Sequence, residues 1–262
     1  MIESLHSPHI ARVKALLGSR GKKERREGGV FIAEGLQFLR EAAQEDASPR
    51  IQTLYLTAAG RLKIVSEKID ITAFEAIDVS DTVMAAMGET VTPQGILAIC
   101  EMPLWEIEDI DIAENSKYVY LHEIQDPGNA GTILRSADAM GFSGLITSAN
   151  SVDIYSPKVV RASAGSLWHL PVYERVELIE LISKWPNDSI YALTADGDKS
   201  LVDINPKAPS LWIFGNEARG IEGLASLRNV TTVHIPMAGN AESLNLASAV
   251  AITLFRVSSA SK

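Results

Sequence analysis

From residue 117 to the C-terminus, short apolar segments alternate with stretches that have the periodicity of helices. The segments of strand character are 118–124, 144–147, 190–194, 211–214 and 231–237. Strand and helix units that alternate at this length predict a parallel sheet with helices on both of its faces. Ligands bind such sheets beyond the carboxyl ends of the strands, so the residues that follow each strand are the candidate site.

Three polar junctions follow strands of this predicted sheet. They are Asp-Pro-Gly-Asn-Ala-Gly at 126–131, Gly-Asn-Glu at 215–217, and a small-residue turn at 238–242. The first is expected to be a loop before a helix over 132–140. After the third, Ser243 is expected to cap a terminal helix that runs to Arg256. Free N–H groups at a helix start attract polar ligand atoms, so the three junctions together predict one ligand site.

The first hundred residues have a pattern of their own. Apolar segments at 30–33, 51–56 and 96–100 predict strands, and helical stretches lie between them. Residues 1–102 are therefore expected to form a small α/β domain of ordinary size. The acidic, aperiodic segment 103–116 is expected to be a linker, and residues 117–262 the second domain.

The charge is distributed unevenly along the chain. The whole chain carries a net charge of −9, but residues 1–30 hold seven Lys and Arg against three acidic residues, a net charge of +4 that leaves −13 for the remainder. The seven cations are Arg12, Lys14, Arg20, Lys22, Lys23, Arg25 and Arg26. A basic arm on an acidic body suits local contact with RNA phosphates, and it equally suits a solvated tail. The glycine-punctuated segment 18–29 is expected to be flexible.

Composition excludes several classes of protein. The single cysteine, Cys100, cannot form an internal disulfide, and the five histidines are too dispersed to predict a metal site. No apolar run reaches the roughly 18 residues of a membrane helix, and no signal-peptide core is evident, so a cytoplasmic location is expected. The dinucleotide, P-loop and nucleophile-elbow motifs are absent.

Several motifs resemble those of the SpoU/TrmH family of RNA ribose 2′-O-methyltransferases, which use S-adenosylmethionine. The first is Asn-Ala-Gly-Thr-Ile-Leu-Arg-Ser-Ala-Asp-Ala-Met-Gly at 129–141, the second Ile-Phe-Gly-Asn-Glu-Ala-Arg-Gly at 213–220, and the third lies at 235–245. Arg-Ala-Ser-Ala-Gly at 161–165 is similar to a further family segment, and 31–35 and 92–95 are similar to the family's small substrate-binding domain. The resemblance covers the whole chain, and three motifs in order are far more specific than one.

The resemblance implies a trefoil-knotted α/β domain, in which the C-terminal helix threads through an earlier loop, preceded by the smaller α/β domain. It also implies a homodimer with active sites near the subunit interface. The residues that would hold S-adenosylmethionine are Leu193, Thr194, Ala195, Gly215, Asn216, Gly220, Ile235, Met237 and Leu244. Gly215 permits a close backbone approach, and the apolar members of this set suit a flat purine.

By the same resemblance, the catalytic residues are Asn129, Arg135, Glu217 and Asn245. Methyl transfer requires the ribose hydroxyl in line with the methyl group and removal of its proton. An arginine is nearly always protonated, so a clamp on a phosphate or on the developing alkoxide suits Arg135 better than a general-base role, and both remain open. Many relatives carry serine where this chain has Ala247, which leaves the details of the substrate pocket open.

The sequence therefore predicts a cytoplasmic RNA ribose 2′-O-methyltransferase that acts on structured RNA, with ribosomal RNA favoured over transfer RNA and with no metal or membrane involvement. One alternative is an RNA-binding module that keeps the knotted fold without transfer activity. Another is a Rossmann-type enzyme of small molecules, which would bind a cofactor and lack RNA affinity.

Overall fold

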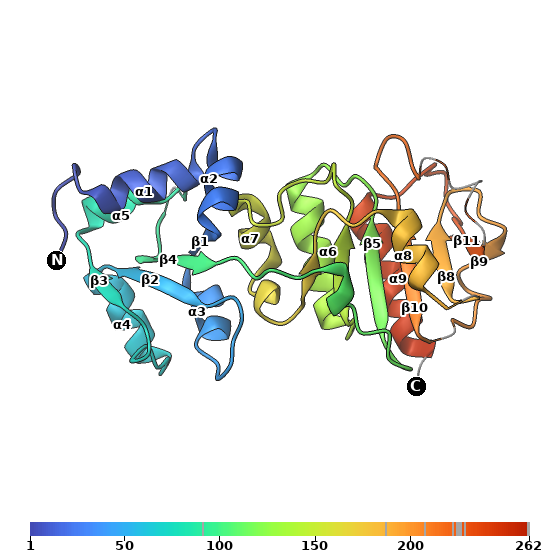
Figure 1. The fold of residues 1–262 in the computed structure, drawn as a ribbon, viewed down its shortest axis with the longest axis horizontal. Helices are drawn as coiled ribbons and strands as arrows, with labels where there is room; N and C mark the ends of the chain where they lie inside the picture. The colour runs from blue at the N-terminus through green and yellow to red at the C-terminus, as the bar shows by residue number, and fades with distance from the viewer. Residues whose placement is uncertain are drawn as a thin grey trace. The chain divides into compact units, whose positions relative to one another are not determined.

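The computed structural model describes residues 1–90, 92–186, 188–206, 208–221, 223, 227 and 229–260. The chain packs as two compact units (Figure 1). The first unit comprises Met1–Leu104 and Asp153–His169, and the second comprises Trp105–Val152 and Leu170–Lys262. Packing thus assigns residues 153–169 to the first unit, whereas the sequence predicted them in the domain at 117–262. In the described part of the chain, no helix is both long and apolar enough to cross a membrane.

The first unit is built on a four-stranded sheet in the order β1-β4-β2-β3. Its elements are α1 (Pro8–Leu17), α2 (Gly21–Gly28), β1 (Val30–Glu34), α3 (Leu36–Ala42), β2 (Ile51–Leu56), α4 (Ala58–Ser66), β3 (Ala76–Asp78), α5 (Asp81–Met87), β4 (Ile96–Glu101), α7 (Pro157–Ser163) and the 3-10 turn Ser166–Trp168. Strand β4 runs antiparallel to β1 and β2, whereas β2 and β3 are parallel. The small α/β domain predicted from the sequence is thereby confirmed.

Both faces of this sheet are covered. On one face, Val13 of α1 and Met87 of α5 are fully buried in a cluster with Ile32 and Leu97 of the sheet. On the other face, the ring of Phe31 lies 5.1 Å from that of Tyr155 and 6.0 Å from that of Trp168. These aromatic contacts explain why residues 153–169 pack with the first unit, because they supply the apolar surface that covers the second face.

The segment 18–29 is not the flexible stretch expected from its composition, because residues 21–28 form helix α2. Arg25 fixes this helix: its guanidinium donates to Asp153 Oδ2 from Nε at 3.1 Å and from Nη2 at 2.5 Å, and Nη1 donates to the carbonyl of Leu16. A Cβ at Gly21 would lie 2.4 Å from the oxygen of Leu16, so only glycine permits this close approach of α2 to α1.

The second unit is built on a seven-stranded sheet in the order β7-β6-β5-β10-β8-β11-β9. Its elements are the 3-10 turn Ile107–Asp109, β5 (Lys117–Leu121), α6 (Pro127–Ala139), β6 (Gly144–Thr147), β7 (Val172–Tyr173), α8 (Leu178–Lys184), β8 (Ile190–Leu193), β9 (Lys199–Ser200), β10 (Ser210–Phe214), β11 (Val230–His234) and α9 (Leu246–Ala260). Every neighbouring pair of strands is parallel, which confirms the parallel sheet that the sequence predicted.

The strand order places the polar junctions side by side. Strands β5, β10, β8 and β11 are consecutive neighbours, so the segments that leave their carboxyl ends meet at one edge of the sheet. The strands themselves are held by a packed interior, in which the rings of Tyr191 and Trp212 stack at 4.5 Å. The chain runs from β5 outward through β6 to β7, and then returns to the other side of β5, which creates the crevice where sheets of this kind bind ligands.

Candidate functional site

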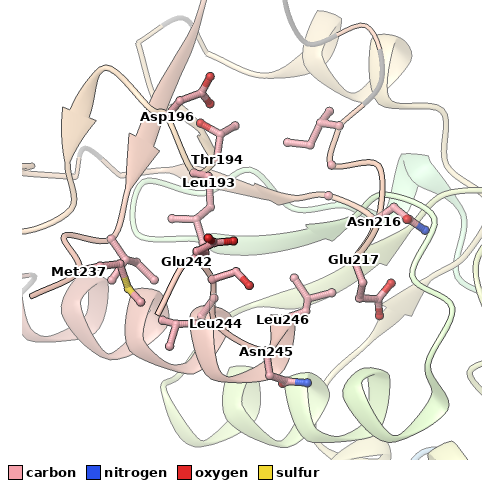
Figure 2. A pocket seen from close by; sticks show the side chains of 17 residues that line it. Leu193, Thr194, Asp196, Asn216, Glu217, Met237, Glu242, Leu244, Asn245 and Leu246 are labelled. Carbon is pink, nitrogen blue, oxygen red and sulfur yellow. The ribbon is translucent and has the colours of Figure 1, made fainter. Parts of the chain in front are cut away.

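A cavity of about 600 Å³ opens at the carboxyl ends of β8, β10 and β11 (Figure 2). Its walls come from four segments, 193–196, 215–221, 235–237 and 242–249. All nine residues predicted to hold the cofactor line it: Leu193, Thr194, Ala195, Gly215, Asn216, Gly220, Ile235, Met237 and Leu244. The structure therefore brings together residues that lie up to about fifty positions apart in the sequence.

One polar atom of the cavity wall lacks a partner. The hydroxyl oxygen of Thr194 is shielded from solvent and has no hydrogen bond within the described part of the chain. Because this oxygen is shielded from solvent even with the cavity empty, a ligand in the cavity would reach it only after the Thr194 side chain rotates. Next to it, Ile235, Met237 and Leu244 give the wall an apolar surface. Ile235 and Met237 were expected to end a strand, but β11 ends at His234, which leaves both free to line the cavity.

The second polar junction forms a closed turn at the end of β10. Asn216 and Gly220 exchange two backbone hydrogen bonds, of 2.8 and 2.9 Å. The side chain of Asn216 accepts from the N–H groups of Ala218 and Arg219, at 2.9 and 3.1 Å. A Cβ on Gly215 would lie 2.3 Å from the carbonyl carbon of Gly220, so glycine is needed for the turn itself. This rigid turn fixes the position of Glu217 at its tip.

Three of the four predicted catalytic residues form one hydrogen-bonded chain. Asn245 donates from Nδ2 to Asn129 Oδ1 at 3.1 Å, and Asn129 donates from Nδ2 to Glu217 Oε1, also at 3.1 Å. All three line a second, more open hollow of about 540 Å³, and Glu217 and Asn245 also line the first cavity. These hydrogen bonds therefore place the Glu217 carboxylate, oriented by the Asn129 amide, at the boundary between the two hollows.

Asn129 is held by the start of helix α6. The sequence predicted a loop over 126–131 and a helix from Thr132, but the helix begins at Pro127. Asp126 caps it by accepting the N–H of Asn129 at 2.7 Å, and Pro127 occupies the first helical position, where its missing N–H costs nothing. The sequence did contain a signal for this earlier helix start, because Asp126 is a typical capping residue and Pro127 favours the first helical position. Its consequence is that Asn129 projects from a rigid first turn rather than from a loop.

Asn245 is held in a similar way by the start of α9. Ser243 was expected to cap this helix, but Asn245 does so: its Oδ1 accepts the N–H groups of Ala247 and Ser248 at 2.9 and 3.3 Å. The amide of Asn245 thus caps with its oxygen and donates to Asn129 with its nitrogen. Ser243 lines the first cavity instead. Ala247, the position at which the family resemblance led us to expect serine, is buried and lies outside the lining of the cavity.

Glu123 was not predicted, yet it joins three segments of the site. Its carboxylate accepts from Asn150 Nδ2 at 3.0 Å and forms an ion pair with Arg219, while its carbonyl accepts from Asn216 Nδ2 at 2.8 Å. The hydrogen bond from Asn150 holds the pKa of Glu123 below its usual value, and the charge of Arg219 acts in the same direction against a raising effect of burial. Its backbone has a φ of 51°, which is uncommon for a side chain of this size and was invisible in the sequence.

Arg135 is the one predicted catalytic residue that the structure does not bring into the group. It lies on α6 six residues beyond Asn129, or about 9 Å further along the helix axis. Its side chain is exposed and lines neither hollow. Six residues also rotate the side chain away from the face of Asn129.

The seven predicted RNA-binding cations separate into two groups. Six are exposed on or beside α1 and α2: Arg12, Lys14, Arg20, Lys22, Lys23 and Arg26. Arg25 is only 5% exposed and is committed to Asp153, so it cannot reach an RNA phosphate. The partner that buries it lies 128 residues away in the sequence, which is why sequence reasoning counted it with the others.

No group of three or more potential metal ligands occurs among the residues that the structure describes. The arrangement instead offers a partly open cavity with one apolar wall, and a carboxylate that Asn129 orients beside a second, more open hollow. Such a site can hold a ligand of mixed polarity and align a hydroxyl of a second molecule against it.

Comparison with known proteins identifies relatives of both units. A model described as the SpoU rRNA methylase family matches residues 116–255, and a model of the MRM3-like substrate binding domain matches residues 10–98. A 23S rRNA (uridine(2479)-2′-O)-methyltransferase from Streptomyces viridochromogenes is 33% identical over 251 residues, which are 92% of this chain and 86% of that protein. A 23S rRNA (guanosine(2553)-2′-O)-methyltransferase from Bacillus subtilis is 28% identical over 98% of this chain and 99% of that one.

Solved structures that are similar to this chain also include rRNA and SpoU methyltransferases. An AdoMet-bound rRNA methyltransferase from Sinorhizobium meliloti superposes with a TM-score of 0.83 at 30% identity, covering 98% of this chain and 96% of that one. The SpoU methyltransferase AviRb from Streptomyces viridochromogenes, in complex with the cofactor AdoMet, superposes with a TM-score of 0.82 at 28% identity, covering 97% and 98%.

Proposed function

Because the chain belongs to the SpoU rRNA methylase family, we propose that it transfers a methyl group from S-adenosylmethionine to a ribose 2′-hydroxyl of ribosomal RNA. The observation that carries this proposal is the position of the Asn245–Asn129–Glu217 chain at the edge of the cofactor-sized cavity. A ligand in the cavity and a ribose in the open hollow would meet at Glu217.

The cavity suits S-adenosylmethionine by its chemistry. Ile235, Met237 and Leu244 offer an apolar surface for the adenine. The closed turn at Gly215 would form the wall beside the ligand. When bound, the cofactor supplies an electrophilic methyl group on a sulfonium sulfur.

Glu217 would orient the ribose hydroxyl and accept its proton or a hydrogen bond from it. Asn129 keeps one oxygen of this carboxylate fixed through a 3.1 Å hydrogen bond, and Asn245 keeps Asn129 fixed in turn. Both amides are anchored at helix starts, so the carboxylate is held in place before the substrate arrives. Glu217, Asn129 and Asn245 would therefore position the ribose hydroxyl and determine where its proton goes.

Arg135 would bind the RNA backbone rather than act as a base. A guanidinium is a poor base, and two parallel hydrogen bonds to a phosphate suit its planar shape. Its exposed position along α6 supports contact with a nucleotide next to the reacting ribose.

The six exposed cations of α1 and α2 would contact RNA phosphates in the first unit. This interaction needs no sequence-specific geometry, because it draws on the release of counterions from the RNA. The first unit would therefore supply affinity for RNA, and the second unit the reaction.

A homodimer, a trefoil knot and a cytoplasmic location belong to the same proposal. Ile252 and Phe255, one turn apart on α9, are 43% and 62% exposed, which supports a second copy covering this helix. The knot rests on membership of the SpoU rRNA methylase family. Light scattering of the intact chain tests the dimer.

The experiment that tests the reaction uses S-adenosylmethionine labelled on its methyl group. The protein is incubated with unmodified ribosomal RNA and, separately, with unmodified transfer RNA, and each product is digested with alkali. A methylated 2′-oxygen cannot attack its own phosphate, so ribose methylation leaves the label in alkali-resistant dinucleotides. Resistant label from ribosomal RNA is the expected result. Label in ordinary mononucleotides would indicate base methylation and contradict the proposal.

Transfer RNA is the second candidate substrate. A protein from Synechocystis named an uncharacterized tRNA/rRNA methyltransferase is 31% identical over 97% of this chain. Resistant label from the transfer RNA pool alone would assign the activity to that substrate.

A further inference from the structure

We propose that Asp196 and Glu242 make the cofactor cavity select S-adenosylmethionine over its demethylated product, S-adenosylhomocysteine, by charge. This inference rests on the proposed function, because it concerns the same cavity and cofactor. It goes beyond that function by assigning a role to two residues of the lining that carry out no chemistry.

The lining of the cavity is acidic. Three carboxylates line it, those of Asp196, Glu217 and Glu242, and the described lining contains no lysine, arginine or histidine. Figure 2 shows the Glu242 carboxylate in the middle of the lining, between Leu193 and Leu244, and Asp196 beside Thr194 at the end of β8.

The three carboxylates differ in their partners. Glu217 accepts a hydrogen bond from Asn129 and belongs to the proposed catalytic group. Asp196 and Glu242 have no ion pair or side-chain hydrogen bond within the described ranges of the chain. Their charge is therefore not neutralised by a neighbour and remains available to a ligand in the cavity.

The two forms of the cofactor differ in net charge by one unit. S-adenosylmethionine carries a sulfonium, an ammonium and a carboxylate, a net charge of +1. S-adenosylhomocysteine keeps the ammonium and the carboxylate and is neutral overall, because its sulfur is a thioether. Carboxylates near the cavity attract the first form more strongly, although their exposure to solvent weakens the effect.

The reaction removes this attraction at the moment when the product must leave. The sulfur–methyl bond breaks with its electron pair staying on sulfur, the ribose oxygen forms the new bond to the methyl carbon, and the hydroxyl proton passes by way of Glu217 to solvent. The sulfonium charge is thereby lost, while the side chains of Asp196 and Glu242 are unchanged. The cavity then holds the neutral product less tightly than the charged cofactor, which favours exchange of one for the other.

The test measures dissociation constants of the full chain by calorimetry for three probes: S-adenosylmethionine, S-adenosylhomocysteine and sinefungin. Sinefungin carries an ammonium group where the cofactor carries its methyl sulfonium, so it has the charge without the sulfonium. In Glu242→Gln and in Asp196→Asn we expect affinity for the two charged probes to fall by about 3- to 10-fold, with affinity for S-adenosylhomocysteine changed less than 2-fold. Raising the salt concentration should reduce the selectivity of the wild type, and it should reduce that of the Asp196→Asn, Glu242→Gln double variant less, because only the Glu217 carboxylate then remains in the described lining.

Glu114→Gln is the matched control. It removes the same charge from an exposed glutamate that precedes β5, at the amino ends of the strands and therefore away from the cavity. We expect it to bind all three probes as the wild type does. An unfolding midpoint equal to that of the wild type shows that a variant is folded.

The outcomes separate the inference from the proposed function. Equal losses for all three probes, or no change in any of them, would overturn the charge-selection role while leaving the cofactor assignment intact. Failure of the wild type to bind any of the three would overturn the cofactor assignment itself.

Discussion

Charges of opposite sign gather in the two units of this protein. The first unit exposes six lysine and arginine side chains on and beside α1 and α2, whereas the cavity of the second unit is lined by three carboxylates and by no cation among its described residues. RNA phosphates are attracted to the first surface and repelled by the second. The cavity suits a cationic cofactor for the same reason.

This separation of charge implies that the first unit contributes affinity for RNA, whereas the second unit determines the position of the reacting ribose. The helices α1 and α2 can bind an RNA phosphate backbone without regard to sequence. The reacting ribose must enter a region of negative charge, where general attraction does not help it. Its position then depends on directed contacts, which the Asn129–Glu217 pair and Arg135 would supply. A substitution on α1 or α2 should therefore change RNA affinity without changing the position of the ribose, and a substitution at the cavity should do the reverse.

The largest effect is expected at Arg25, the buried member of the seven cations that the sequence predicted to bind RNA. In Asp153→Asn, the buried guanidinium of Arg25 loses its charged partner and remains out of contact with water. Breaking a buried ion pair from one side costs about 3–5 kcal/mol, so we expect a loss of that size in the free energy of unfolding, measured in urea.

Asp46→Asn, which changes an exposed carboxylate of the same unit, is the control and should leave the stability unchanged. A combined Arg25→Met and Asp153→Leu variant should regain part of the loss, since it removes both charges. If Asp153→Asn kept its stability and bound RNA less tightly, Arg25 would have to be counted with the RNA-binding cations after all.

The second effect concerns the placement of the ribose. Asn129→Ala removes the 3.1 Å hydrogen bond to Glu217 and the acceptor of Asn245. Misplacement of a positioned group can cost about 100-fold in rate, so we expect kcat to fall by about that factor. Affinity for S-adenosylmethionine should change by less than about 3-fold, because Asn129 does not line the cofactor cavity.

Thr132→Ala serves as the control, because Thr132 is exposed on the same helix one turn further on. Its kcat should equal that of the wild type. An Asn129→Ala enzyme of normal kcat would show that the hydrogen-bonded chain does not position the reacting groups.

The sequence was sufficient to predict the parts of this molecule that depend on local pattern. Apolar runs placed the strands β5, β8 and β10, and the order of elements predicted the parallel sheet, which the structure confirms. The motifs led to nine cavity residues, because a resemblance to a family carries spatial information that one sequence by itself lacks.

The rest depended on contacts between distant segments. Arg25 looked like any other cation of a basic run, because its partner Asp153 follows only after 128 residues. Glu123 gave no signal, since its role depends on Asn150 and Arg219 in separate loops. The helix starts were misjudged for a different reason: several polar residues could cap each helix, and only the observed geometry shows which one does.

A smaller effect is expected when exposed lysines are removed from α1 and α2. Lys14→Ala and Lys22→Ala each remove one exposed charge from α1 or α2. Each should weaken RNA binding by about 3- to 10-fold at low salt and reduce the slope of affinity against salt concentration by about one phosphate contact. Fluorescence anisotropy with a labelled RNA measures both. Affinity for S-adenosylmethionine should be unchanged, in contrast to Glu242→Gln.

Lys199→Ala provides the matched control, because it removes an exposed lysine from β9 of the second unit. It should bind RNA with the affinity and the salt slope of the wild type. Equal weakening by Lys199→Ala would mean that RNA affinity follows the net charge of the chain rather than the surface formed by α1 and α2.

The smallest effect is a pH dependence at Glu123, which contacts Asn216 and Arg219 of the turn that follows β10. The hydrogen bond from Asn150 lowers the pKa of this carboxylate in the folded protein, and the charge of Arg219 adds to it. A carboxyl group with a lowered pKa stabilises the folded state above its unfolded pKa of about 4.5, and this stabilisation is lost as the pH falls through the folded value. Urea midpoints of wild type and Glu123→Gln should therefore differ at pH 7 and converge below pH 4.5. A difference that stayed constant down to pH 3 would mean that glutamine disturbs the packing of the turn, and that the ion pair with Arg219 does not hold it.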